Sequence, residues 1–123
     1  IVLSFFLGKT KVTPRFLMNE RTLLLLLKKK KGLFLAILDL TQTESSLTTP
    51  ELEKVLKQKK IFLSCIDRVD LQIKEFRHAF SSELPQDIQE ELEEIRDVII
   101  RILDTDKRNY AQKKKEFGIY ERP

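Results

Sequence analysis

The two most reactive side chains, Cys65 and His78, each occur once in the chain of 123 residues. A thiolate and an imidazole can build a nucleophilic or metal-binding site if both reach one point in space. Both fall in a stretch that we expect to be one helix, on which they would lie about 20 Å apart along the axis. We therefore predict neither a catalytic pair nor a zinc site, but a small buried Cys65 and a surface His78.

Carboxylates are the next candidates for chemistry. Glu90, Glu94 and Asp97 recur at i, i+4 and i+7, which places them on one face of a helix. A di-iron bundle also needs Glu-x-x-His motifs on facing helices, and the sequence has none. No glycine-rich phosphate loop or nucleophile motif occurs either. We interpret these acids as solvated charge and predict a protein that is not an enzyme and holds no cofactor or metal.

Two basic runs, Lys28–Lys31 and Lys113–Lys115, offer contacts to nucleic acid. The net charge is only +4, however, and a nucleic-acid binder more often concentrates its charge on one face. Lysine stems also cover apolar helix surface, so we favour a solvated face for Lys28–Lys31 and regard nucleic acid as an unlikely partner. The single cysteine excludes an internal disulfide and indicates a reducing compartment.

The elements that position these residues are helices. From Leu52 to Phe80, apolar residues recur at alternating steps of three and four, with Lys59 as the polar interruption. Before this stripe, Thr48-Thr49-Pro50-Glu51 supplies a threonine cap, a first-turn proline and an acid near the positive helix end. We predict a helix from Pro50 to about Phe80. Its stripe is Leu52, Val55, Lys59, Phe62, Ile66, Val69, Ile73, Phe76 and Phe80.

Two further helices are expected on either side of it. The first begins at the N-cap Asn19, runs to about Ser45, and is weakened at Gly32. The other runs from Pro85 to about Phe117, before a capping Gly118. Its predicted stripe is Ile88, Leu92, Ile95, Ile99 and Ile102, after which Asp106 interrupts it.

Short connections between long helices favour antiparallel neighbours. We therefore predict an all-α fold, an antiparallel up-down-up bundle of three long helices with coiled-coil-like packing. Folding the chain at residues 82–83 sets Arg68, Lys74 and Arg77 opposite the acidic start of the last helix. We divide the chain into an N-terminal extension (1–18), the bundle (19–118) and a C-terminal tail (119–123).

The apolar run Ile1–Leu7 is too short to span a bilayer or to form the core of a signal peptide. We expect no membrane insertion and a cytoplasmic protein. Two interpretations of residues 1–17 stay open: an extension upstream of Met18, or a segment whose Phe5 and Phe6 pack onto the bundle.

Apolar side chains exceed what three narrow stripes require. Some widen the core, and the rest can form a groove for an amphipathic helix or the face of a homodimer. A self-associating coiled-coil scaffold is therefore the alternative to a binding protein. The surplus is Leu24, Leu25, Phe34, Leu56, Leu63, Val98, Ile100, Leu103, Tyr110, Phe117, Ile119 and Tyr120. We place the partner-binding site where Asp106 interrupts the stripe, at Leu103, Tyr110, Phe117, Ile119 and Tyr120.

Residues 49–60, TPELEKVLKQKK, lead to Ile66-Asp67-Arg68-Val69-Asp70 and resemble the middle helix of bacterial flagellar export chaperones. These small helical proteins escort hook-associated and filament-cap subunits to the type III export gate. Residues 92–97 and 106–110 are similar to the family's last helix, and the resemblance covers roughly residues 19–117. The turn Thr48-Thr49-Pro50 replaces the family's Gly-Asp-type turn, and Lys28–Lys31 has no counterpart. The resemblance implies a cytoplasmic chaperone that shields the helical tail of a client, with the last helix as its contact.

Overall fold

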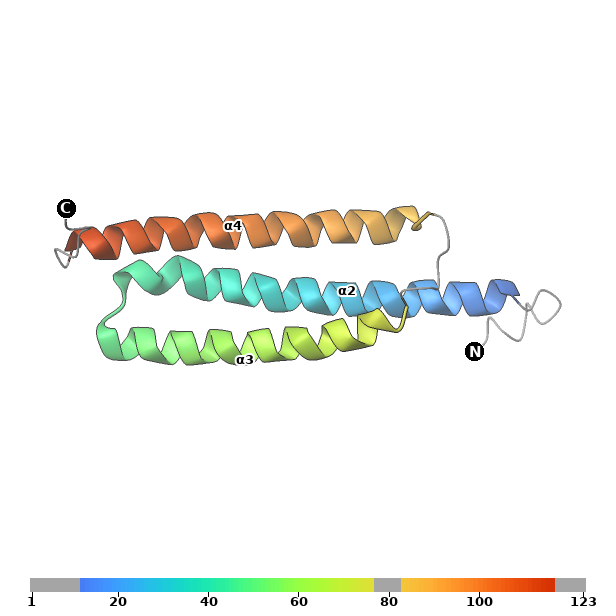
Figure 1. Ribbon diagram of the computed structural model, residues 1–123, viewed down its shortest axis with the longest axis horizontal. Coiled ribbons are helices and arrows are strands. Elements are labelled where there is room, and N and C mark those ends of the chain that lie inside the picture. Colours follow the sequence, from blue (N-terminus) through green and yellow to red (C-terminus); the bar gives the residue numbers. More distant parts are fainter. Residues whose placement is uncertain (1–11, 77–82, 117–123) are drawn as a thin grey trace.

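A computed structural model of the chain describes residues 12–76 and 83–116. These residues form α2 (Val12–Thr43), the 3₁₀ turn η1 (Glu44–Ser46), α3 (Thr49–Lys74) and α4 (Gln86–Glu116). Helix α2 lies between α3 and α4 and packs against both (Figure 1). α3 runs antiparallel to the other two helices, and the described ranges contain no strand. The predicted all-α, up-down-up bundle of three long helices is confirmed.

Helix α3 begins at the cap that the sequence predicts. The Thr48 side chain accepts a hydrogen bond from the Glu51 backbone N–H at 3.4 Å, and Oε1 of Glu51 accepts one from the Thr48 N–H at 2.9 Å. These reciprocal bonds satisfy N–H groups that have no partner within the helix. Hydrogen bonds of the Glu51 carboxylate with the backbone and the side chain of Thr48 hold the pKa of Glu51 below its ordinary value.

The other helix ends differ in part from the prediction. α2 begins at Val12, not at Asn19, because Pro14 falls in the first turn, where a helix tolerates proline. It ends at Thr43, where η1 takes over. α3 ends at Lys74, well before Phe80, whereas α4 matches its predicted bounds to within one residue. Predictions for His78, Gly118 and the first eleven residues lie outside the described residues.

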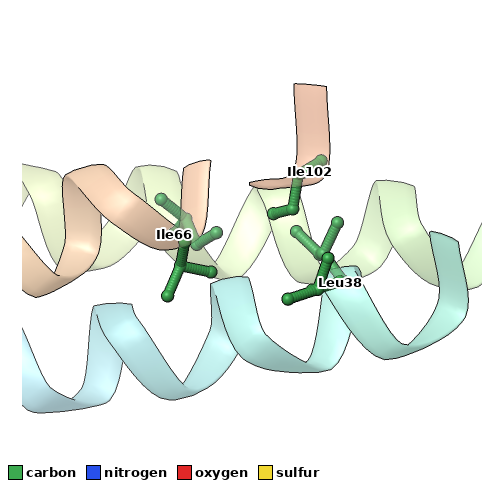
Figure 2. Packing of buried hydrophobic residues seen from close by; sticks show 5 residues of the cluster. Leu38, Ile66 and Ile102 are labelled. Atoms are coloured by element: carbon green, nitrogen blue, oxygen red, sulfur yellow. The ribbon is translucent and has the colours of Figure 1, made fainter. Parts of the chain in front are cut away.

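The core contains two apolar clusters along α2. In the first, Leu38, Ile66 and Ile102 come from the three different helices and converge on one point (Figure 2). Ile37 and Val98 complete it, so Val98 belongs to the core and not to the surplus surface. The second cluster lies nearer the start of α4 and contains Leu23, Leu27, Ile88 and Ile95.

The buried stripe of α4 differs from the predicted one at every second position. Leu92 is 40% exposed, whereas its neighbour Glu91 is 4% exposed. Ile88, Ile95 and Ile102 are buried as predicted, but the buried residues between and after them are Glu91, Val98 and Thr105, in place of Leu92, Ile99 and Asp106. Both series alternate by three and four, so periodicity alone does not distinguish them. Charged partners from α2 accompany the buried Glu91.

Candidate partner-binding surface

Four charged side chains join α2 to α4. Nζ of Lys31 lies 2.8 Å from Oε2 of Glu91 and 2.6 Å from Oε1 of Glu94, and Nζ of Lys28 lies 3.3 Å from Oε1 of Glu91. Burial raises the pKa of Glu91, but the ion pairs with Lys31 and Lys28 outweigh it and hold that pKa below its ordinary value. The bonds to Glu91 and Glu94 in turn raise the pKa of Lys31. This pairing allows a glutamate to occupy a core position.

These ion pairs correct two predictions. Only part of the run Lys28–Lys31 is a solvated face: Lys28 and Lys29 are exposed, whereas Lys30 also pairs across the bundle, with its Nζ 2.7 Å from Oδ1 of Asp70 in α3. Arg68 and Lys74 are exposed on α3 and do not neutralise the start of α4. The physical reason is that α2, and not α3, is the main neighbour of α4.

A second charged cluster lies toward the other end of the bundle. Nζ of Lys59 is 2.5 Å from Oε2 of Glu44 in η1 and 3.7 Å from Oδ1 of Asp106 in α4. The side chains of Lys59 and Glu44 are largely buried. Nearby, Nδ2 of Asn109 donates a hydrogen bond of 2.8 Å to the carbonyl oxygen of Thr41. These contacts tie α2, η1, α3 and the C-terminal half of α4 together.

An open apolar pocket adjoins this cluster, between the start of α3 and the C-terminal half of α4. We call it the Tyr110 pocket; its volume is about 290 Å³. Tyr110 is 66% exposed and Leu56 is also exposed, so apolar surface remains uncovered here. Nζ of Lys114 lies 5.5 Å from the centroid of the Tyr110 ring, within the range of a cation–π contact. The lining residues are Glu44, Leu52, Leu56, Asp106, Asn109, Tyr110 and Lys113.

A second pocket lies near the end of α3 and the start of α4. We call it the Phe76 pocket, and its volume is about 190 Å³. All of its lining side chains are apolar, so it offers contacts to apolar groups but no acid, base or nucleophile. They are Leu23, Leu27, Ile73, Phe76, Leu84, Ile88 and Leu92.

The structure places two of the five predicted partner-binding residues. Tyr110 lines the Tyr110 pocket, and Leu103 is exposed on α4 two turns before it. Phe117, Ile119 and Tyr120 lie outside the described residues. Leu52 and Leu56 of α3 were not predicted as site residues. The exposure of Leu56 is foreshadowed by its place in the surplus, but its position beside Tyr110 depends on the packing of α3 against the bundle.

The described residues offer little for catalysis. Cys65 is partly buried on α3, and Glu90 and Asp97 are exposed on α4. No group of three His, Cys, Asp or Glu side chains in ranges 12–76 and 83–116 could hold a metal ion. Within the same ranges, no helix has the length and apolar character needed to cross a membrane.

Comparison with family models, with curated proteins and with solved structures gives no match for this chain. A functional proposal therefore depends on the surface itself and on the sequence resemblance of α3 and α4.

Proposed function

We propose that this chain is a non-catalytic adaptor of the export-chaperone type, which binds an amphipathic helical segment of a client protein in the cytoplasm. The Tyr110 pocket is the observation that carries the proposal. It presents exposed apolar side chains from two helices around a shared opening. Amphipathic helices bind such openings by inserting apolar side chains that recur at i, i+3, i+4 and i+7.

Tyr110 has the properties of a binding anchor. Its ring is large and exposed, and it has few rotatable bonds, so little conformational entropy is lost when a partner covers it. Tyrosine is also enriched among the few residues that dominate binding energy at protein interfaces. The resemblance of residues 49–60 and 92–110 to flagellar export chaperones supports a flagellar or secreted client, bound through its helical tail.

The test is binding of a fluorescently labelled helical tail of a flagellar filament-cap protein, followed by fluorescence anisotropy. We expect Tyr110→Ala and Leu56→Ala each to weaken binding by about tenfold, the effect of losing roughly 1.4 kcal/mol. Leu25→Ala is the matched control, because Leu25 is an exposed α2 leucine that lines neither pocket. Circular dichroism verifies that each variant stays helical. Absence of binding, or an equal loss with Leu25→Ala, would contradict the proposal.

A self-associating scaffold is the second candidate. It is favoured by exposed apolar residues outside the two pockets, namely Leu25, Ile61 and Leu71. Large exposed apolar surface often marks an interface between protein chains. Light scattering across a dilution series separates the candidates: a scaffold stays oligomeric at every concentration, whereas an adaptor is monomeric when dilute and without client.

A further inference from the structure

Between the two pockets, Leu63 of α3 and Leu103 of α4 are exposed apolar residues that line neither pocket. The Lys59–Asp106 ion pair fixes the level of these antiparallel helices, so each step forward along α3 matches one step back along α4. Leu56 is then within one residue of the level of Tyr110, and Leu63 within one residue of the level of Leu103. Leu56 and Tyr110 do line one pocket together, which supports this register independently.

The same register extends to the other end of the bundle. It places Ile73 of α3 level with Leu92 of α4, and these two residues line the Phe76 pocket together. Leu63, Leu92 and Leu103 are all exposed. From Leu56 to Ile73 the line of apolar pairs measures about 25 Å, at 1.5 Å per helical residue. We call this line the α3–α4 groove, defined by Leu56, Leu63, Ile73, Leu92, Leu103 and Tyr110.

A helix is the element that fits this groove. A helix of about 17 residues has its length, and side chains one heptad apart match the separation of the Leu56 and Leu63 levels. A fourth helix lying against α3 and α4 would also complete a four-helix bundle, in which each apolar stripe has a partner.

Basic side chains lie on both edges of the groove. Lys60 follows Leu56 by four residues and precedes Leu63 by three, so it lies beside both on the helix surface. Lys107 has the same relation to Leu103 and Tyr110, and Arg96 lies one turn after Leu92. All three cations are exposed.

Acids on the same edges are fewer or already neutralised. Asp106 pairs with Lys59, and Lys114 adds a further cation against the Tyr110 ring. Glu53 and Asp67 are the acids at equivalent positions, and both belong to the α3 edge. The α4 edge of the groove is therefore basic.

We propose that the α3–α4 groove binds an acidic amphipathic helix of a partner protein, whose Asp and Glu side chains flank its apolar stripe and face the basic edge of α4. This inference rests on the proposed function and specifies the charge and length of the segment bound. A second copy of the chain fits less well, because a two-fold dimer that sets the α4 edges of both protomers against each other would bring like charges together.

The experiment uses two synthetic peptides of about 21 residues, roughly six helical turns, each stapled into a helix and carrying the same leucine stripe. One has Glu at the flanking positions and the other has Lys. We expect the full chain to bind the acidic peptide at least about tenfold more tightly than the basic one at low salt, and the difference to shrink as salt is raised. The double variant Arg96→Glu/Lys107→Glu should abolish or reverse the preference.

Lys29→Glu/Lys57→Glu is the matched control, because it makes the same change of charge on exposed lysines that do not border the groove. Leu63→Gln and Leu103→Gln should each weaken binding of the acidic peptide while leaving the helix content of the protein unchanged. Equal affinity for both peptides, or a preference unaffected by Arg96→Glu/Lys107→Glu, overturns the acidic partner but leaves the proposed adaptor intact.

Two other outcomes would also overturn the inference. If the client tail binds but neither stapled peptide does, the groove is not the site, although the adaptor function holds. If the chain is a dimer at micromolar concentration and Leu103→Gln makes it a monomer, the groove is an interface between copies. The proposed function itself fails only when the client tail does not bind or binds independently of Tyr110 and Leu56.

Discussion

Lys59 of α3 and Asp106 of α4 lie at the same level of the bundle, with Nζ and Oδ1 3.7 Å apart. In the sequence each residue is a polar position in an otherwise apolar stripe. In the structure these two polar residues form an ion pair with each other. Glu44 completes the group and is largely buried together with Lys59. A buried charge that loses its partner is costly, so these residues depend on one another. They also disfavour registers that would set either charge against an apolar stripe.

Loss of the Lys59 ammonium should destabilise the bundle. We expect Lys59→Met to lower the free energy of unfolding by about 1–3 kcal/mol, because Glu44 stays buried without its partner. Urea denaturation at neutral pH measures the change. Lys60→Met is the control on the adjacent exposed lysine and should stay within about 0.5 kcal/mol of wild type. Equal effects of the two substitutions would show that the buried Lys59–Glu44 pair contributes nothing to the free energy of unfolding.

Acid should weaken the pairing between α2 and α4. The folded-state pKa of Glu91 lies below its ordinary value, so the pairing stabilises the fold above the unfolded-state pKa and is lost as the pH falls through the folded-state pKa. We expect Lys31→Met to cost about 1–2 kcal/mol at neutral pH, and its difference from wild type to shrink in acid. Denaturation curves across pH check this, with Lys29→Met as the exposed control. A difference that does not vary with pH would contradict it.

Gly32 offers a stabilising substitution. It lies exposed inside α2, and a Cβ added there meets no atom within 4 Å. Alanine favours the helix over glycine by up to about 1 kcal/mol, partly by restricting the unfolded chain. We therefore expect Gly32→Ala to raise the melting temperature. A decrease would mean that this part of α2 is not a continuous helix.

Two isoleucines on α3 test the packing of the bundle. Ile66 is 4% exposed and Ile61 is 56% exposed. Removing the buried side chain leaves a cavity, so we expect Ile66→Ala to cost about 2–4 kcal/mol. Ile61→Ala should cost below about 1 kcal/mol, since its side chain already contacts water. The two variants are compared by chemical denaturation, and similar losses would place α3 in a different rotation about its axis.

Local signals in the sequence predicted much of the fold. The cap of α3 could be predicted because Thr48 and Glu51 satisfy each other's backbone groups and need no other element. The start of α2 was misjudged because proline ends a helix from within but is tolerated in its first turn. Both cases depend on a few neighbouring residues.

Features that depend on contacts between several helices could not be predicted from local signals in the sequence. Glu91, and not Leu92, lies on the buried face of α4, where its partners Lys28 and Lys31 come from another helix. Hydrophobicity alone favours Leu92, which the structure leaves exposed and therefore available to the α3–α4 groove. The pairing of Leu56 with Tyr110 likewise follows from the register of α3 against α4. Reasoning from one helix at a time therefore did not predict the α3 side of the candidate site.

We propose that apolar side chains of α3 and α4 together form the partner-binding surface. Amide chemical shifts of isotope-labelled protein, recorded while the client-tail peptide is titrated in, test it most directly. We predict shifts in residues 52–63 and 103–113, with the exposed leucines of α2, Leu25 and Leu35, unchanged. Shifts confined to the exposed face of α2, or no shifts at saturating peptide, would contradict the account.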